Sequence, residues 1–299
     1  MNSSEFGKIT NGLATKKSQI DDQTKLAFWL YLLYLISFFL RLPARLPALG
    51  AISFDFLLVG LIVFLILGAK ATKGAKLDIA SKYLLAIFVY SIITLPLVEW
   101  PGSVVNNGMV AFIKGAIFYF FTVNLVSNIK RLKSVIFVFV LCNLIRILEP
   151  LLLNITSGYL GSSTYIGSGE FAGRLAGAPS DTINPNGLAF VIATVIPFLH
   201  FVFAPINKKT YALYLLLIPI LIYTMILTMS RSGVLALAII AVGIWLKSSH
   251  KAALMILGAL GLVVISMSLN EVQRDRYLSL VSELLSNLVY DHQAALLSD

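Results

Sequence analysis

The sequence has few of the residues on which soluble proteins depend. Only 12% of its 299 residues are charged and 58% are hydrophobic, against about 25% and about 45–50% in an ordinary soluble domain. A single cysteine, Cys142, excludes a disulfide framework and a cysteine-based metal cluster, and three histidines leave little for a zinc site. The hydrophobic residues form long uninterrupted runs that one buried core cannot hold. The composition therefore excludes a soluble globular protein and indicates a polytopic membrane protein.

Nine apolar runs are predicted to span the membrane. Each is expected to be a helix, because a spanning segment must satisfy its own backbone hydrogen bonds within hydrocarbon. The runs lie at residues 26–40, 53–69, 83–98, 109–127, 133–153, 187–204, 210–229, 233–246 and 251–268. The predicted fold is all-α, a polytopic transmembrane helical bundle over residues 26–268. A cytoplasmic tail, 1–25, precedes it and an outside segment, 269–299, follows it.

The distribution of Lys and Arg predicts the orientation. The formal net charge is +9, and most of the 23 Lys and Arg lie between the apolar runs. With the N-terminus in the cytoplasm, the inner segments hold more than twice as many of these cations as the outer segments, as the positive-inside rule requires. The C-terminus is then outside. Topology and contact with anionic lipid head groups explain the charge, so nucleic-acid binding is not needed.

Three ionisable residues lie well inside the predicted spans, toward their outer ends. Helix direction places Lys114 near the outer end of the fourth span, and Arg146 and Glu149 near the outer end of the fifth. An ionisable residue within a membrane is costly enough to be a functional candidate. Two simpler interpretations stay open: Arg146 pairs with Glu149 three residues further on, and Lys114 extends to the head groups.

The longest predicted outer segment, 154–186, contains a run rich in Gly, Pro, Asn and Ser. Such a run cannot continue a helix and makes tight turns. Asn184 or Asn186 can cap the N-terminus of the sixth span, and Pro185 suits its first turn. Arg174 is the only cation in this segment.

A second polar interruption, Thr228–Gly233, separates the seventh and eighth spans. The eighth run has 14 residues where roughly 17–25 are expected, so this turn lies in or at the membrane. Ser230 or Ser232 can cap the eighth helix, whose N–H groups and partial positive charge then face outward. Arg231 adds five donors suited to phosphate oxygens, and the pattern predicts an anion site. The alternative is a tight turn whose arginine anchors to lipid phosphates.

These segments, in this order, resemble the O-antigen ligase and O-antigen polymerase family. The similar segments are Arg174-Leu-Ala-Gly177, Asn184-Pro-Asn186-Gly-Leu-Ala189 at the start of a span, and Thr228-Met-Ser-Arg-Ser-Gly233 after the next span. The family's members are multi-span bacterial proteins of the inner membrane with a helical glycosyltransferase fold of the C class. At the outer face they take a glycan from an undecaprenyl diphosphate carrier and pass it to lipid A core or to a growing glycan.

The resemblance implies an enzyme that transfers or polymerises oligosaccharide. Arg174 and Arg231 match the family's motif arginines and are expected to hold the diphosphate as its negative charge grows, without a metal or cofactor. The expected partners are the undecaprenyl diphosphate-linked glycan donor, a glycan or lipid-linked acceptor, and membrane lipids. The other expected substrate-binding residues are Lys114, Arg146, Asn186, Ser230 and Ser232, of which Lys114 and Arg146 come from topology alone.

The sequence departs from the family after its ninth span. Family ligases carry a large outer loop with a histidine thought to activate the acceptor, followed by further spans. Here Arg274-Asp-Arg276 begins such a loop, and the sequence ends at Asp299. We therefore expect the C-terminal part to be lacking. His292 does not lie in a similar motif, and Glu170 and Asp181 are the alternative general bases.

Two other functions stay open at this point. The first is an inactive remnant that inserts, binds carrier lipid and performs no chemistry. The second is a secondary transporter with a path lined by Lys114, Arg146 and Glu149. Transporters usually hold their site near the midplane between related halves, whereas these charges lie outward and no repeat is found in the sequence.

Overall fold

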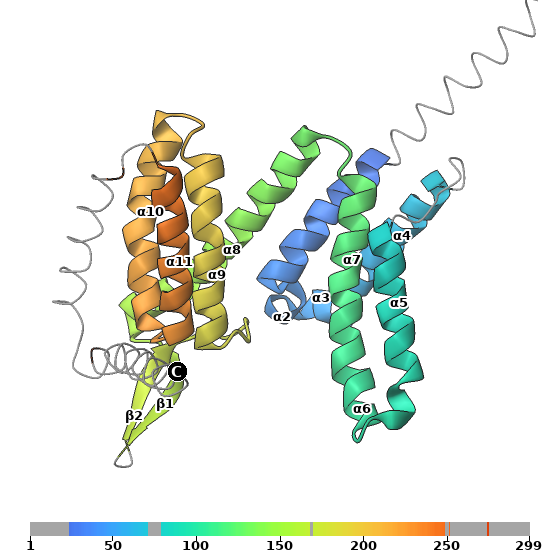
Figure 1. Cartoon of the computed structure of the whole chain (residues 1–299), viewed down its shortest axis with the longest axis horizontal. Helices are drawn as coiled ribbons and strands as arrows, with labels where there is room; N and C mark the ends of the chain where they lie inside the picture. The colour runs from blue at the N-terminus through green and yellow to red at the C-terminus, as the bar shows by residue number, and fades with distance from the viewer. Residues whose placement is uncertain (1–23, 71–78, 168–169, 249–250, 252–273, 275–299) are drawn as a thin grey trace, which may run out of the picture. The chain divides into compact units, whose positions relative to one another are not determined.

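A computed structural model describes residues 24–70, 79–167, 170–248, 251 and 274 (Figure 1). The chain divides into two compact units, one up to Phe139 and the other from Val140. Helix α8, Ile129–Ser157, crosses this division and contributes to both units. Each unit is described by itself below.

The described part of the first unit is helical. Four short helical segments start with a proline in their first two positions, where its fixed φ and missing N–H do no harm. The elements are a helix at Thr24–Leu40, α2 (Leu42–Arg45), α3 (Pro47–Ala51), α4 (Phe54–Lys70), α5 (Ile79–Ile93), the 3-10 turn η1 (Leu95–Leu97), α6 (Pro101–Ser103), the π-helical turn η2 (Val104–Met109), α7 (Val110–Leu125) and the first part of α8.

An aromatic core holds this unit together. Tyr31 of the first helix packs edge-on against Phe121 of α7, with ring centroids 5.7 Å apart, and its hydroxyl lies 2.8 Å from Thr122 Oγ1. Ile62 of α4 is fully buried in the same cluster. In contrast, α5 has no buried residue, and Tyr83 is 68% exposed. Apolar side chains on the outside are expected where lipid replaces water as the solvent.

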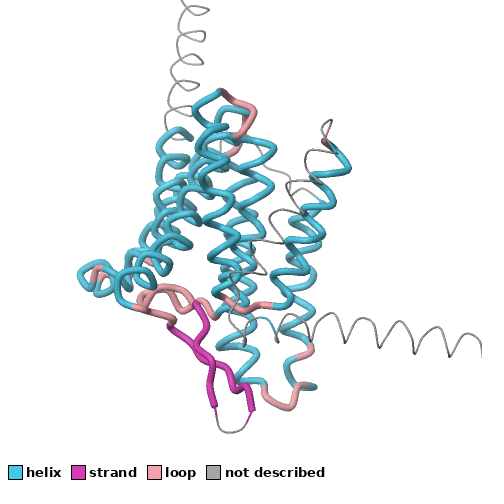
Figure 2. The backbone as a smooth tube through the Cα atoms, turned by 90° about the vertical axis from the view of Figure 1, so that its left-hand side faces the viewer, coloured by secondary structure: helices cyan, strands magenta, loops and turns pink. Residues whose placement is uncertain are grey.

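The described part of the second unit combines helices with a β-hairpin. Strands β1 (Gly161–Gly167) and β2 (Glu170–Leu175) pair antiparallel, with Gly161 opposite Leu175 (Figure 2). The helical elements are the later part of α8, α9 (Pro185–Phe198), the π-helical turn η3 (Leu199–Phe203), α10 (Lys208–Leu227) and α11 (Arg231–Lys247).

The hairpin is a β element that the sequence analysis did not predict, in a described chain that is otherwise helical and agrees with the predicted all-α membrane protein. It lies in the segment 154–186, which the sequence analysis treated only as turns. Tyr165 and Phe171 face each other across the strands, with ring centroids 5.5 Å apart. Such cross-strand aromatic pairs stabilise a short antiparallel ribbon. Because the glycines around these residues weaken the alternating pattern of a strand, the sequence signal was easily read as a loop.

Close packing of α9 against α11 forms the centre of the second unit. The first turn of α11 approaches α9 so closely that a Cβ added at Gly233 would lie 2.5 Å from the Cβ of Ala189. Leu188 and Ile192 of α9 and Leu221 of α10 are completely buried. The backbone approach at Gly233 therefore fixes where α11 begins relative to α9.

Helices occupy the positions of the first eight predicted spans, whereas the ninth lies outside the described residues except for Lys251. Within the described residues, four helical segments are long and apolar enough to cross a membrane: Pro101–Leu125, Ile129–Ser157, Pro185–Phe203 and Lys208–Leu227. Three apolar helices are shorter: Thr24–Leu40, Phe54–Gly68 and Ile79–Ile93. The structure thus agrees with a helical membrane protein, and nine spans remain a prediction. The tail 1–25 and the segment 269–299 lie almost entirely outside the described residues.

Candidate functional site

The segments that resemble the family motifs meet at one end of the second unit. At this end α9 begins, α10 ends and α11 begins, and β2 reaches the same place (Figure 1). Arg174 of β2 makes the connection. Its Nε donates to the carbonyl of Thr228 at 2.9 Å, and its Nη2 donates to Asn186 Oδ1 at 2.8 Å and to the carbonyl of Met229 at 3.5 Å. One guanidinium thus joins the hairpin to the first turn of α9 and to the α10–α11 turn.

Arg174 is buried, which favours a role in holding the α10–α11 turn in place. Its exposed fraction is 9%, and a buried charge is tolerated when hydrogen bonds satisfy it. The sequence analysis expected Arg174 to hold the diphosphate directly. In this structure, donors of Arg174 bind protein acceptors, which makes the side chain a brace for the turn that carries Arg231.

The turn between α10 and α11 has an unusual backbone. Met229 has φ 50°, in the left-handed region that residues with a Cβ avoid, and this conformation ends α10. Thr228, Met229 and Ser230 have exposed fractions of 2% or less. Within the turn, Thr228 Oγ1 donates to the Met225 carbonyl at 2.7 Å and accepts from the Ser230 N–H at 3.3 Å. The bonds from Arg174 to two of its carbonyls stabilise this conformation further.

Side-chain caps start both helices of the site. Asn184 Oδ1 accepts from the Gly187 N–H at 2.7 Å and caps α9, with Pro185 in the first turn. Ser230 Oγ accepts from the Gly233 N–H at 3.2 Å and caps α11. Each cap is one of the two residues that the sequence analysis considered. The other candidates differ in role, because Asn186 accepts from Arg174 and Ser232 is exposed, with its Oγ 3.3 Å from Ser230 Oγ.

Replacing Ser230 by alanine should lower the free energy of unfolding of the second unit by about 1 kcal/mol, because the Gly233 N–H loses its cap. Ser232→Ala is the matched control and should change stability little, since Ser232 does not cap the helix. Thermal unfolding of the detergent-solubilised chain measures both. Equal losses in the two variants would contradict the assignment of the cap.

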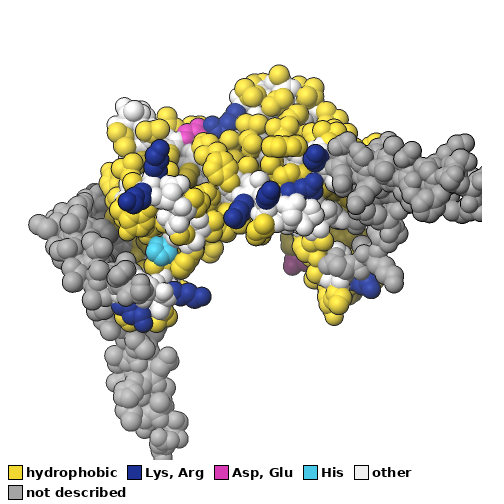
Figure 3. Space-filling model, turned by 90° about the horizontal axis from the view of Figure 1, so that it is seen from above, with side chains coloured by type: hydrophobic (Ala, Val, Ile, Leu, Met, Phe, Trp, Pro, Cys, Tyr) yellow, Lys and Arg dark blue, Asp and Glu magenta, His cyan; other side chains and the backbone are white. Residues whose placement is uncertain are grey.

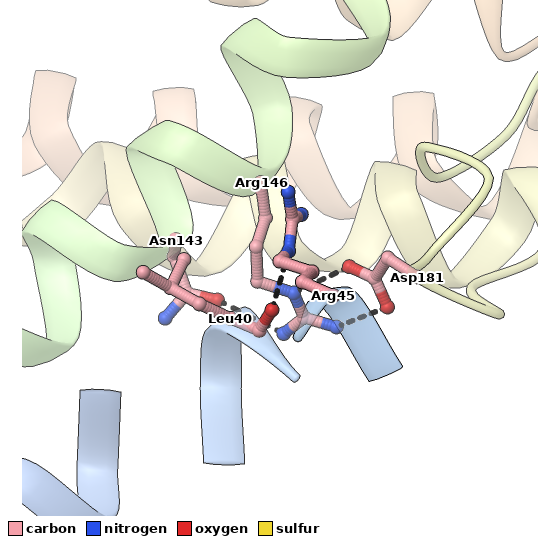
Figure 4. A network of polar contacts seen from close by, with 5 residues as sticks. All are labelled: Leu40, Arg45, Asn143, Arg146 and Asp181. Atoms are coloured by element: carbon pink, nitrogen blue, oxygen red, sulfur yellow. Dashed lines mark hydrogen bonds and ion pairs between the residues drawn. The ribbon is translucent and has the colours of Figure 1, made fainter. Parts of the chain in front are cut away.

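An ion pair fixes the loop between the hairpin and α9 (Figure 4). Arg146 of α8 donates from Nε to Asp181 Oδ2 at 2.7 Å and from Nη2 to Oδ1 at 3.1 Å, and its Nη1 lies 3.4 Å from Asn143 Oδ1. The two paired side chains are 13% and 3% exposed. The same view contains a separate bond in the first unit, from Arg45 Nε to the carbonyl of Leu40 at 2.6 Å.

This pairing revises two sequence-based interpretations. Arg146 forms a bidentate ion pair with Asp181, a residue of the loop, and not only with an acid on its own helix such as Glu149. Asp181 was an alternative general base, but both its oxygens accept from Arg146. We therefore assign Asp181 to holding the loop in place.

A second contact ties the same loop to the end of α8. The Tyr159 hydroxyl donates to the Gly177 carbonyl at 2.7 Å. Burial raises the pKa of Tyr159, and the charge of Glu149 raises it further, so the hydroxyl keeps its proton. Gly177 is required here because a Cβ would lie 2.6 Å from the Asp181 carbonyl oxygen. The loop is thus held by Arg146 on α8 and by Tyr159, two residues after the end of that helix.

The other predicted residues lie as follows. Arg231 is the first residue of α11 and is partly exposed at the same end of the second unit. Lys114 lies on α7 in the first unit, where it is exposed, and it is not among the residues that the second unit brings together. Glu170 begins β2, and His292 lies outside the described residues. In the described part of the chain, no group of three His, Cys, Asp or Glu is placed to hold a metal ion.

Comparison with protein-family models, curated proteins and solved structures finds no match for this chain.

Proposed function

We propose that this protein transfers or polymerises oligosaccharide from an undecaprenyl diphosphate carrier at the outer face of the bacterial inner membrane. The supporting observation is the meeting of motif segments through Arg174, which binds a carbonyl 54 positions further along the chain. Arg174, Asn186 and the Thr228–Gly233 turn are far apart in the sequence and adjacent in space. The resemblance to the O-antigen ligase and polymerase family gives this cluster its proposed chemistry.

In the proposed reaction an acceptor hydroxyl attacks the donor sugar at C1. The new bond from C1 to the acceptor oxygen forms as the bond from C1 to the diphosphate oxygen breaks, with inversion at C1. Undecaprenyl diphosphate leaves with the electron pair, and the hydroxyl proton passes to a general base. Arg231 and the N-terminus of α11 stabilise the charge that grows on the diphosphate.

Arg174 and the capped helix starts have a positioning role in this proposal. Arg174 holds the carbonyls of Thr228 and Met229, directly before the cap residue and Arg231. Electrostatic stabilisation of a transition state depends on groups fixed before the reaction starts, so a braced turn suits this chemistry. The proposed orientation, with the N-terminus cytoplasmic, places this end at the outer face.

Arg231→Ala should reduce glycan transfer about 10²–10³-fold, the usual effect of removing one group that stabilises transition-state charge. The measurement is transfer from a synthetic undecaprenyl diphosphate-linked oligosaccharide by the whole chain in proteoliposomes. Lys209→Ala, an exposed cation at the other end of α10, is the control and should be fully active.

Three outcomes of this experiment separate the functions. Unchanged transfer in both Arg231→Ala and Arg174→Ala would contradict the proposed site. Binding of the carrier lipid that depends on Arg231, without any transfer, would identify the inactive remnant. Movement of solute across the proteoliposome membrane without transfer would identify the transporter.

A further inference from the structure

An open apolar groove of about 340 Å³ runs between α5 and α7 in the first unit. Its volume lies in the range of small-ligand sites, roughly 300–1,000 Å³. The rings of Phe88 and Phe112 stack at one part of the groove, with centroids 6.0 Å apart and planes 17° apart. Ser81, in the first turn of α5, lines the groove together with Leu84 and Phe120 and is one of its polar residues. Apart from a serine and a tyrosine, the groove thus offers hydrocarbon and aromatic surface.

The end of the groove near Ser81 is basic. Lys82 is the next residue and is exposed. Arg131 marks the same end of the unit, because its Nη1 donates to the carbonyl of Leu125, the last residue of α7, at 2.8 Å. The guanidinium carbon of Arg131 is also 5.0 Å from the centre of the Phe28 ring.

Further cations lie at this end. Lys25 is one turn before Phe28 on the first helix, and Lys130 and Lys133 flank Arg131 on α8, all three being exposed. Figure 3, the view from the top of Figure 1, shows Lys and Arg side chains among apolar ones.

The acidic residues described in this unit lie toward the opposite end. Asp55 accepts a hydrogen bond from Ser37, in the last turn of the first helix, and Glu99 comes just before α6. The basic end is therefore complementary to anionic head groups. By the positive-inside rule it is also the cytoplasmic end.

We propose that the groove holds an acyl chain of an anionic phospholipid from the cytoplasmic leaflet, with its head group near Lys82. The apolar lining fits an acyl chain, and the charge at its mouth fits a phosphate. The lipid is distinct from the glycan carrier of the proposed reaction, whose diphosphate lies at the opposite face. Because α5 has no buried residue, the bound chain adds packing that the helix otherwise lacks.

The test is native mass spectrometry of the whole detergent-solubilised chain, titrated with phosphatidylglycerol or with phosphatidylcholine carrying the same acyl chains. The wild type should bind phosphatidylglycerol about fivefold more tightly than phosphatidylcholine, because one lysine near an anionic head group contributes about that factor. Ala116→Phe fills the groove and should weaken phosphatidylglycerol binding at least about tenfold, because several buried methylenes are lost. Ala111→Phe, also on α7 but exposed and outside the groove lining, should bind as the wild type does.

Lys82→Gln separates the head group from the chain and does not disturb the groove. It should remove the preference for phosphatidylglycerol and leave phosphatidylcholine binding unchanged. Equal binding by Ala116→Phe and Ala111→Phe would overturn the groove as the site. Equal affinity of the wild type for both lipids would overturn the anionic head group, and displacement of phosphatidylglycerol by undecaprenyl phosphate would overturn the identity of the lipid. Arg231→Ala should bind phosphatidylglycerol normally, so the result is independent of the transfer assay.

Discussion

Replacing Asp181 by alanine should lower the free energy of unfolding of the second unit by about 3–5 kcal/mol. The change leaves the guanidinium of Arg146, which is only 13% exposed, without the two carboxylate oxygens that it binds. The loop between β2 and α9 then loses its bond to α8 and keeps only the bond from Tyr159, of the two described above. Denaturant titration of the purified chain, followed by a probe in the second unit such as Trp245, measures the loss.

A double replacement shows whether the lost stability comes from the charge of Arg146 once its carboxylate partner is removed. Arg146→Met combined with Asp181→Leu removes both charges and fills a similar volume, so most of the lost stability should return. Asp181→Asn keeps the shape and one acceptor oxygen and should lie between the wild type and Asp181→Ala. A cost below about 1 kcal/mol for Asp181→Ala would place the pair among exposed ion pairs and contradict its structural role.

Replacing Arg174 by alanine should reduce both stability and transfer. Without Arg174, the carbonyl of the completely buried Thr228 loses its charged donor. The free energy of unfolding should fall by about 1.5–3 kcal/mol. Arg174→Lys should restore little, because a lysine is a point charge and cannot reach Asn186 and two carbonyls at once. Unfolding and glycan transfer are measured on the same preparations.

A double-mutant cycle distinguishes positioning from direct binding. If Arg174 acts through the turn that carries Arg231, removing both arginines should reduce transfer no more than removing Arg231 alone. Independent multiplicative losses, or full transfer by Arg174→Lys, would instead make Arg174 a direct ligand of the diphosphate. The positioning role derived from its burial would then be wrong.

The sequence predicted those features that depend on neighbouring residues. Apolar runs marked the helices. Each cap was narrowed to two candidates, Asn184 or Asn186 and Ser230 or Ser232, and the structure selects Asn184 and Ser230. The eighth span was predicted from Gly233, whereas α11 begins at Arg231. The first two residues of α11, Arg231 and Ser232, are polar. A span predicted from hydropathy starts only at the first apolar run, so these two residues were left out of it.

Features that depend on distant partners could not be predicted. Nothing near Asp181 indicates that Arg146, on another helix, supplies its partner, and Glu149 was the nearer acid. Arg174 was singled out for its charge. Two of its acceptors are the backbone carbonyls of Thr228 and Met229, and every residue has such a carbonyl, so the sequence cannot identify these bonds. The hairpin was missed because its glycines resemble those of a loop.

The bond between Arg146 and Asp181 also orders events during biosynthesis. The two residues are 35 positions apart, so at about 5–20 residues per second Asp181 leaves the ribosome about 2–7 s after Arg146. The arginine of α8 is therefore synthesised before the carboxylate that it binds, and a charge within a membrane is costly until it is paired. Docking of the hairpin and its loop is then a late maturation step, which closes over a helix already inserted.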